Sequence, residues 1–259
     1  MAINPPRGTQ SIVRAVELLK VLGTRRKIGW RLTDLAAQCR LDDSTVHRIM
    51  ACLSSLRLVQ QRPGDRRYVP GPVLYELAVA LPDHHAFQAA CHQSLLRVAR
   101  KTGWVGYLYL RSGDDSVCID RVGTSSVQLL NDIGARRPLA GSSFGIAMLL
   151  SLSSQDQRAT LAANRKSIRA IAPHRNSGYV RMLQRSKRHG MGISLGDIIQ
   201  GVGSIGIPIL DARRQPVAAI GLRGPLGEFS RDRIAAAAQL LRDEAERIER
   251  EQQELIAEF

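Results

Sequence analysis

The sequence is poor in the residues that cross-link a chain, anchor it in a membrane or hold a metal. It has four cysteines in 259 residues, Cys39, Cys52, Cys91 and Cys118, and they form no C-x-x-C pair. This spacing argues against a disulfide framework and against a zinc site. Runs of about 18 apolar residues are absent, and the first residues, MAINPPRGTQ, lack the apolar centre of a signal peptide. We therefore expect a cytoplasmic protein with no membrane association, no metal and no cofactor.

Acidic residues are also scarce, and the shortage is greatest in the first part of the chain. The whole sequence has 37 Lys and Arg against 23 Asp and Glu, a formal net charge of +14. Residues 1–72 contain 13 basic and 5 acidic residues, so +8 of the total falls in little more than a quarter of the length. This concentration of positive charge indicates a polyanionic partner. The length is sufficient for two modest domains.

The first part of the sequence has the hydrophobic periodicity of three short helices. We expect Ser11 to cap a helix that ends before Gly23, and Thr33 to cap a second one. A third helix is expected to begin after Asp42 or Asp43. Its apolar positions, which we expect to be buried, are Val46, Ile49, Met50, Leu53 and Leu56. Two short helices separated by about four residues make a helix-turn-helix.

The third helix leaves polar side chains on the face that its apolar residues do not use. These side chains belong to Ser44, Thr45, His47 and Arg48. Hydroxyl, imidazole and guanidinium groups near a helix N-terminus suit a recognition helix in the major groove of DNA, where they reach base edges and phosphates. The alternative interpretation is an ordinary solvated helix face.

A basic hairpin is expected directly after this helix. Residues 58–71, LVQQRPGDRRYVPG, show the pattern of a strand, a turn at PGD and a second strand. The hairpin presents Arg62, Arg66 and Arg67, which suit contacts to phosphates or the minor groove. The three helices, the hairpin and the charge together predict a winged helix-turn-helix DNA-binding domain over residues 1–70.

A linker helix over residues 71–83 and a second domain over residues 84–259 are expected next. The linker begins near Pro72, and its apolar surface fits either a core contact or a dimer contact. The long helix that follows ends near Gly103 and contains His84, His85, Cys91 and His92. Because these four residues include no H-x-x-x-H or C-x-x-C pair, we assign no metal site to them.

Beyond Gly103 the pattern changes to that of strands joined by short polar turns. Strands are expected over residues 105–112, 115–123, 127–134, 204–211 and 217–224, helices near 143–163 and 177–189, and a charged closing helix over 230–255. Antiparallel strands with helices before, between and after them describe an α+β domain.

Taken together, these segments resemble the IclR family of bacterial transcriptional regulators. The resemblance extends from about Ser11 to Arg247 and rests on the winged segment, on DSVCIDRV, on RRPLAGSSFGIAMLL and on GIPILDARRQPVAAIGLRGP, in that order. It implies an N-terminal winged helix that binds double-stranded operator DNA as a dimer. It also implies a C-terminal GAF-like domain with an antiparallel sheet that binds a small-molecule effector, in a homodimer or a dimer of dimers.

The segment GSSFG at 141–145 satisfies the G-x-S-x-G pattern of a hydrolase nucleophile. However, Pro138 is poorly suited to a preceding central strand, and His174 and His189 follow Ser143 with no convincing acid between them. We therefore assign no catalytic residue and expect no enzymatic activity. The segment also fits a helix cap, or a cap whose free backbone N–H groups bind an anionic ligand.

The resemblance implies that this helix start forms part of the effector pocket. The implied effector-binding residues are Ser142, Ser143, Phe144, Gly145, Ser194, Asp197, Ser204, Gly221 and Arg223. Where the family often has Asp and Cys, this chain has Ser194 and Ser204, so the ligand's identity stays open. Strand alternation places Gly221 and Arg223 on one face. We expect Arg223 to hold a ligand carboxylate; its alternatives are a pair with Asp197 or a position in solvent.

Two classes of function agree with these features. The first is a metabolite-responsive, sequence-specific DNA-binding transcriptional regulator that recognises a near-palindromic operator. The second is an architectural DNA-binding protein whose C-terminal domain only mediates oligomerisation.

Overall fold

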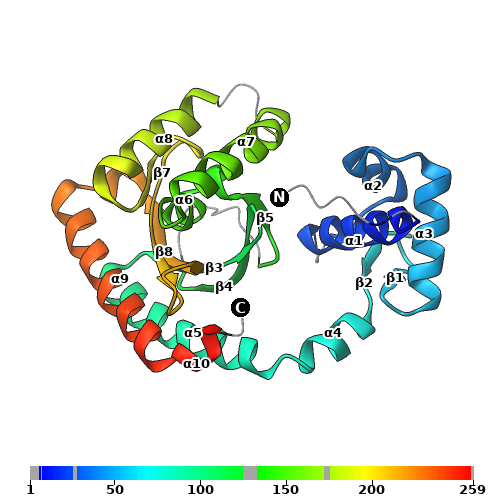
Figure 1. Ribbon diagram of the computed structural model, residues 1–259, viewed down its shortest axis with the longest axis horizontal. Helices are drawn as coiled ribbons and strands as arrows, with labels where there is room; N and C mark the ends of the chain where they lie inside the picture. Colours follow the sequence, from blue (N-terminus) through cyan, green and yellow to red (C-terminus); the bar gives the residue numbers. More distant parts are fainter. Residues whose placement is uncertain (1–5, 7, 26–27, 125–132, 172–175, 258–259) are drawn as a thin grey trace. The chain divides into compact units, whose positions relative to one another are not determined.

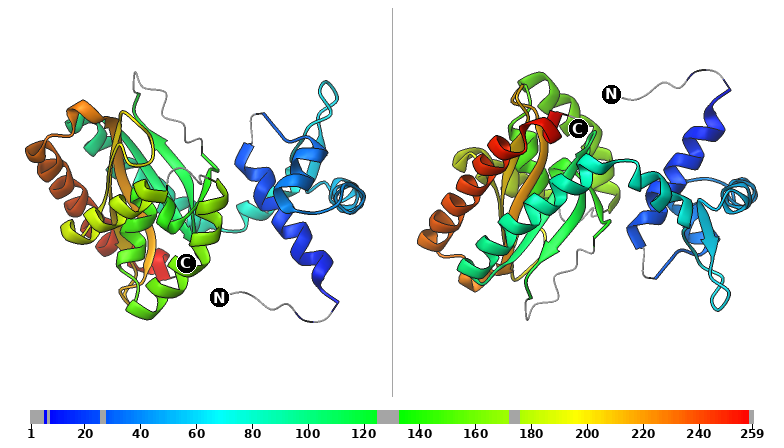
Figure 2. Two further views of the ribbon diagram at one scale, coloured as in Figure 1. Left: turned by 90° about the horizontal axis from the view of Figure 1, so that it is seen from above. Right: turned by 90° about the horizontal axis from the view of Figure 1, so that it is seen from below.

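The computed structural model describes residues 6, 8–25, 28–124, 133–171 and 176–257 (Figure 1, Figure 2). The chain divides into two units, Met1–Pro82 and Asp83–Phe259. Among the described residues, every helix is too short or too polar to cross a bilayer.

The first unit contains three helices followed by a two-stranded hairpin and a further helix. Its elements are α1 (Gln10–Leu22), α2 (Leu32–Cys39), α3 (Asp43–Ser55), β1 (Val59–Gln61), β2 (Tyr68–Pro70) and α4 (Pro72–Val79). Leu18, Leu35 and Met50, one from each of the first three helices, are fully buried in a common core. β1 and β2 pair antiparallel around the PGD turn. The predicted helix-turn-helix and its wing are therefore confirmed.

Two of the predicted helix caps are wrong. Ser11 lies inside α1, whose N-cap is Thr9, and Thr33 lies inside α2, whose N-cap is Arg31. The start of α2 is set by tertiary contact, because the backbone N–H and C=O of Trp30 pair with Tyr68 in β2 at 3.0 and 2.8 Å. The chain can turn into a helix only after this bridge, and the next residue has no short acceptor side chain.

The start of α3 is as predicted, whereas its end is not. The carboxylate of Asp42 accepts a hydrogen bond from the backbone N–H of Thr45 at 2.7 Å. Leu56, which we expected to be buried, is 57% exposed. The helix ends at Ser55, and Arg57 then adopts a left-handed conformation with φ of 57°. After this turn Leu58 and Val59, rather than Leu56, pack on the core.

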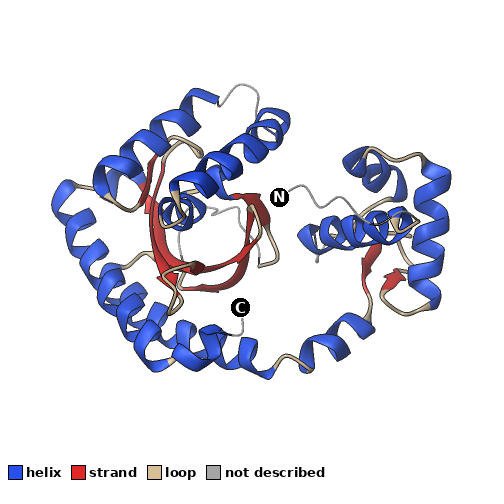
Figure 3. Cartoon of the chain, viewed as in Figure 1, coloured by secondary structure: helices blue, strands red, loops and turns tan. Residues whose placement is uncertain are grey.

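The second unit is an α+β fold built on one six-stranded antiparallel sheet (Figure 3). Its strands are β3 (Val105–Ser112), β4 (Asp115–Val122), β5 (Arg136–Pro138), β6 (Gly192–Leu195), β7 (Val202–Leu210) and β8 (Pro216–Pro225), in the order β5-β4-β3-β8-β7-β6. Its helices are α5 (Pro82–Thr102), α6 (Ser143–Leu150), α7 (Ser154–Ile171), α8 (Asn176–His189), α9 (Arg231–Glu251) and α10 (Gln253–Ala257).

The two faces of this sheet carry separate cores. Leu108 and Ile220 face α5 and α9, which lie on the outer side of the curved sheet (Figure 1). Tyr107 and Tyr109 face α6 and α7 on the inner side. This division follows from strand alternation, because successive side chains of a strand point to opposite faces.

The expected strands and helices of this unit are confirmed in most places. The expected strand over 127–134 lies outside the described residues apart from a turn at its end, and the helical segment near 143–163 is two helices, α6 and α7. Two strands, β5 and β6, were not predicted. Pro138 is compatible with β5 because β5 is at the edge of the sheet, where a missing N–H interrupts no ladder.

A row of three glycines brings α6 close to the sheet. Gly192, Gly206 and Gly221 lie opposite one another on β6, β7 and β8. A Cβ atom on Gly192 would collide with the carbonyl oxygen of Ser143, and one on Gly221 would lie 2.5 Å from a ring carbon of Phe144. The first turn of α6 therefore lies directly on the backbone of three strands, a contact that only glycine permits.

We expect Gly221→Ala to lower the free energy of unfolding of the second unit by about 1 to 3 kcal/mol, because the added methyl group overpacks this contact. Denaturant unfolding followed by the fluorescence of Trp104 measures the change. Gly227→Ala is the matched control, since a Cβ at Gly227 would meet nothing within 4 Å. Equal stability of the two variants would show that α6 and the sheet can move apart at Gly221 without a measurable cost in stability.

Candidate functional site

The GSSFG segment forms the capped start of α6. The Ser142 side chain accepts a hydrogen bond from the backbone N–H of Gly145 at 3.0 Å, so the capping interpretation is confirmed. The hydroxyl of Ser143 lies 2.7 Å from that of Ser204 on β7, which fixes the helix start to the sheet. The N–H groups of Ser143 and Phe144 have no acceptor within the helix, because the first turn of a helix has none.

A polar network from α7 holds the turn before α6. The amide oxygen of Asn164 accepts from the backbone N–H of Ala140 at 2.9 Å, and its nitrogen donates to the carbonyl oxygen of Asp114. The hydroxyl of Thr160 donates to the Asp114 carboxylate at 2.7 Å. Sequence reasoning missed both α7 residues. The signal that could have identified them is spacing. Thr160, Asn164 and the buried Ile168 follow one another at intervals of four, which places all three on one helix face.

The central feature of the site is the buried guanidinium of Arg223, which is 4% exposed. Its Nε and NH1 atoms have no hydrogen-bond partner. The guanidinium carbon lies 4.9 Å from the ring centre of Tyr107 and 5.3 Å from that of Phe144. Register places Ser194, Ser204 and Arg223 in one row across β6, β7 and β8. Arg223 therefore shares the face of the sheet on which α6 begins.

A second unpaired donor lies beside Arg223. The hydroxyl of Tyr107 is buried and has no hydrogen-bond partner. Burial raises the pKa of this phenol above its ordinary value, and the charge of Arg223 opposes the rise only in part. The phenol is therefore protonated at neutral pH and, like the guanidinium, is able to donate a hydrogen bond. An acceptor that reached both groups would satisfy them together.

Neither alternative position of Arg223 is observed. The residue is not in solvent, and the carboxylate of Asp197 is engaged by other cations. Asp197 accepts hydrogen bonds from the Arg185 guanidinium and from the backbone N–H of Leu195, and its side chain is 2% exposed. Arg181 lies 3.5 Å from its other oxygen. Within the described part of the chain, the charge of Arg223 is balanced only by the faces of the two aromatic rings.

The structure brings together most of the residues expected at the effector site. Ser143, Phe144, Ser204 and Arg223 lie around the start of α6, and Gly221 lies under the Phe144 ring. Ser142 and Gly145 form the cap, and Ser194 is buried at the end of the row on β6. Asp197 instead binds α8. Tyr107 was not anticipated, although its place in an alternating strand indicated a buried ring.

The arrangement around Ser143 differs from that of a hydrolase. Its hydroxyl is bonded to another hydroxyl, that of Ser204, rather than to a base. His189 is at the exposed end of α8, and His174 lies outside the described residues. A nucleophilic serine needs an adjacent base to remove its proton, which Ser204 does not supply.

The four candidate metal ligands at the start of the second unit do not converge. Cys91 is buried in the outer core, and burial raises the pKa of its thiol. His92 Nδ1 lies 2.7 Å from a carboxylate oxygen of Asp120. In the ranges that the structure describes, no cluster of three His, Cys, Asp or Glu side chains is arranged to hold a metal ion.

The exposed face of α3 presents His47 and Arg48 to solvent, and neither has an ion pair or side-chain hydrogen bond to another described residue. Ser44 and Thr45 also take part in the cap of the helix. The Ser44 hydroxyl and the Thr45 backbone N–H donate to Asp42, and these bonds hold the pKa of that carboxyl well below its usual range. The cap is therefore charged at neutral pH, and Thr45 is half-buried beside it.

The three arginines of the wing are not equivalent. Arg62 donates to Asp65 at 2.8 Å and to the carbonyl oxygen of Ile28. Arg67 lies 3.6 Å from the same carboxylate. Arg66 is exposed at the turn, with a φ of 53°, and its side chain contacts no described residue by hydrogen bond or ion pair. Two arginines therefore brace the hairpin, while one faces solvent.

A winged helix-turn-helix unit followed by an α+β unit with buried, unpaired donors is the arrangement of a transcriptional regulator with DNA-binding and effector-binding domains. Two family models match the chain: the IclR helix-turn-helix domain over residues 11–63, and the bacterial transcriptional regulator IclR C-terminal domain over residues 80–250. The chain belongs to the IclR family.

Individual relatives agree with this assignment. The glycerol operon regulatory protein of Streptomyces griseus is 27% identical over 229 residues, which cover 87% of this chain and 89% of that protein. The crystal structure of an IclR transcriptional regulator from Alicyclobacillus acidocaldarius is 23% identical, with a TM-score of 0.72 and coverage of 92% and 97%. An IclR homologue from Microbacterium hydrocarbonoxydans, complexed with 4-hydroxybenzoate, is 18% identical, with a TM-score of 0.68 and coverage of 93% and 98%. These relatives are regulators rather than enzymes.

We expect Arg185→Ala to lower the free energy of unfolding of the second unit by about 2 kcal/mol, because it removes the main charged donor to the buried Asp197 carboxylate. Arg188→Ala is the control on the same helix, since Arg188 is exposed and has no ion pair among the described residues. Denaturant midpoints measure both. Equal midpoints would show that Arg181 alone is sufficient to hold Asp197.

Proposed function

We propose that the chain regulates transcription in response to a small carboxylate held by Arg223 in its second unit. The observation that carries this proposal is the buried guanidinium with two unpaired nitrogens beside the unpaired hydroxyl of Tyr107. An isolated buried cation is costly, so a site of this kind favours an anion that enters with its own charge. The planar fork of arginine matches the two oxygens of a carboxylate.

The surroundings of Arg223 indicate what else the ligand contacts. The free N–H groups of the first turn of α6, at Ser143 and Phe144, favour a negative oxygen. The rings of Tyr107, Tyr109 and Phe144 lie on the same face, with Tyr109 stacked on Phe144 at 4.6 Å. Apolar walls of this kind suit a ligand with an apolar body. The 4-hydroxybenzoate bound by the relative from Microbacterium hydrocarbonoxydans has both a carboxylate and such a body.

For the first unit, the proposal is recognition of a near-palindromic operator by a homodimer, or by a dimer of dimers. One short recognition helix contacts too few base pairs to be selective alone. Large apolar side chains are exposed on this unit, among them Ile12 at 62% and Val16 at 43% on α1 and Tyr75 at 75% and Val79 at 62% on α4. Exposed apolar surface of this kind supports a contact between two copies.

Within each copy, His47 and Arg48 contact bases, and Arg66 contacts a phosphate. Arg48→Ala should weaken binding by about 1 to 3 kcal/mol and relax the preference at one operator position. Arg66→Ala should weaken binding to all sequences alike and reduce the slope of log K against log salt by about one unit. Duplexes selected from a random library by the wild-type chain provide the operator for both titrations.

The control for the wing is Arg67→Ala. Because Arg67 lies against Asp65, its loss should loosen the hairpin without the same change in salt slope. If Arg66→Ala removes sequence preference and leaves the slope unchanged, Arg66 contacts a base and our assignment is reversed. A single half-site bound at full affinity by one copy contradicts the dimer.

For the ligand, we expect Arg223→Met to abolish the thermal shift that small carboxylates produce and their effect on DNA affinity. Binding to the native state raises its melting temperature by mass action, so a screen of aliphatic and aromatic carboxylates with their neutral amides measures the site. The unliganded variant should be at least as stable as the wild type, because methionine replaces an uncompensated buried charge.

Two outcomes count against this assignment. If Arg223→Met responds to carboxylates with unchanged affinity, Arg223 is not the anchor. If no compound in a broad panel shifts the wild type, the second unit serves oligomerisation alone, and the chain is an architectural DNA-binding protein.

A further inference from the structure

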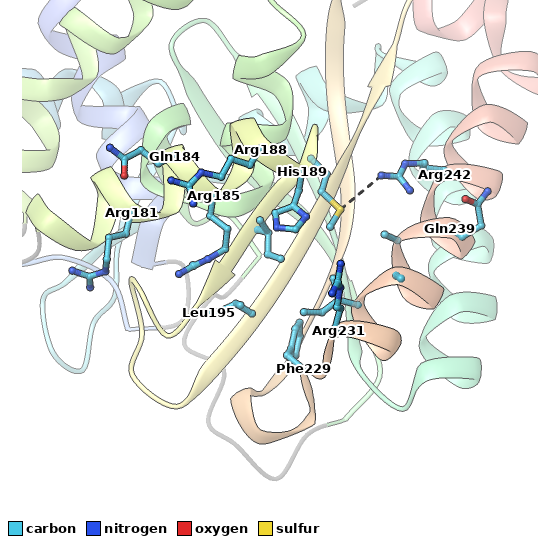
Figure 4. Close-up of a pocket in the computed structure, with 15 residues that line it drawn as sticks. Arg181, Gln184, Arg185, Arg188, His189, Leu195, Phe229, Arg231, Gln239 and Arg242 are labelled. Carbon is cyan, nitrogen blue, oxygen red and sulfur yellow. Dashed lines mark hydrogen bonds between the residues drawn. The ribbon is translucent and has the colours of Figure 1, made fainter.

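A groove of about 980 Å³ lies along the edge of the sheet in the second unit, between α8 and α9 (Figure 4). Its floor is apolar: Met191, Ile193 and Ile234 are buried in it, and Leu195 of β6 and Ala235 of α9 are more exposed. Its walls are cationic, with Arg181, Arg185 and Arg188 on α8 and Arg231 and Arg242 on α9. Among the described residues that line it, none is acidic. The groove is separate from the Arg223 site, which is on the α6 side of the sheet.

The positive charge of the walls is only partly neutralised. Asp197 engages Arg181 and Arg185. In the described ranges, no ion pair involves Arg188, Arg231 or Arg242, and the closest polar contact of Arg242 is to the Met191 sulfur at 4.0 Å. Both walls therefore offer free guanidinium groups to an occupant.

The floor of the groove is closed to an added strand. The outward backbone groups of Ile193 are bonded to the Ser186 hydroxyl, which accepts from its N–H at 2.9 Å and lies 3.3 Å from its carbonyl oxygen. The N–H of Leu195 donates to the Asp197 carboxylate at 3.0 Å. Pairing with a sheet edge requires free backbone groups, so side chains must bind whatever occupies this groove.

The dimensions of the groove fit a short helix. Arg181 and Arg188 are about 10 Å apart along the axis of α8, and Arg231 and Arg242 about 16 Å apart along α9, from a rise of 1.5 Å per residue. Two to three turns of a third helix have this length. A polyphosphate or nucleic-acid backbone would pair with the walls but gain nothing from the apolar floor.

We propose that this groove docks an acidic amphipathic helix of a partner protein. The apolar face of that helix packs on Leu195 and Ala235, and carboxylates on its two flanks pair with Arg188 on one wall and with Arg231 and Arg242 on the other. Apolar anchoring sets the orientation, and the charges on both sides set the selectivity.

Fluorescence anisotropy on the full chain tests the proposal with a labelled synthetic peptide of about 18 residues, about 27 Å as a helix, that has leucine on one face and glutamate on both flanks. The peptide should bind with an affinity that falls as salt rises. A scrambled peptide of the same composition should bind at least about tenfold more weakly, because its leucines do not form one face. The double variant Arg188→Glu with Arg242→Glu should lose at least about tenfold in affinity for the ordered peptide.

The matched control is Arg158→Glu with Arg213→Glu, which changes the charge equally at two exposed arginines outside the groove. It should bind the ordered peptide as the wild type does. Arg188→Gln alone should lose affinity in the same direction, so the test does not depend on the folding of the double variant.

Four results overturn the proposal. Equal loss in the two double variants, or equal binding of the two peptides, shows that net charge alone attracts the peptide. Random-sequence duplex DNA is the competitor for the third result. If this DNA displaces the peptide, and if only the groove variant fails to bind the DNA, the groove is a nucleic-acid site. A change in the sedimentation of the chain by itself in the groove variant makes the occupant a second copy.

Discussion

The second unit depends on the close approach of one helix to the backbone of three strands. Because residues 192, 206 and 221 are glycines, their row across the three strands carries no side chain under the start of α6. Because the helix start lies so near the sheet, Ser143 reaches Ser204, and the Phe144 ring covers Gly221. A larger residue in the row would lift α6 and separate its first turn from Arg223. The geometry of the proposed ligand site is therefore set by glycines of the sheet beneath it.

The same approach explains how a guanidinium is tolerated in the interior. Arg223 is two residues beyond the glycine row, at the next position on the same face, where the opposite residues on β6 and β7 are the small Ser194 and Ser204. Its charge faces two aromatic rings, which offset part of the cost of removing it from water. The carboxylate ligand that we propose would offset the remaining cost. Asp197 does not relieve it, because Arg185 binds that carboxylate on the other side of β6.

The fold was largely predictable because its elements have strong local signals. Helical periodicity, the Asp42 cap and the alternating strands around Tyr107 and Leu222 identify their elements without tertiary information. The short edge strands β5 and β6 could not be predicted, because pairing with a neighbour defines them more than their own residues do. The start of α2 was misplaced for the same reason, since the bridge between Trp30 and Tyr68 determines it.

At the candidate sites, side-chain types were predictable and their partners were not. Arg62, Arg66 and Arg67 look alike in the sequence, and only the position of Asp65 separates the exposed one from the two that brace the hairpin. Asp197 is not the partner of Arg223, because Arg185, which is distant from Arg223 in sequence, binds that carboxylate. Pairings of this kind are properties of the folded chain.

The presence of two cores on one sheet has a consequence for how such a chain diverges. Alternate residues of β3 and β8 have different functions. Leu108 and Ile220 pack under α5 and α9, whereas Tyr107 and Arg223 face α6. Substitutions on the α6 face can alter which small molecule is accepted while the packing on the other face stays intact. A strand of this sheet thus evolves as two interleaved sequences, one under selection for chemical specificity and the other for the persistence of the fold.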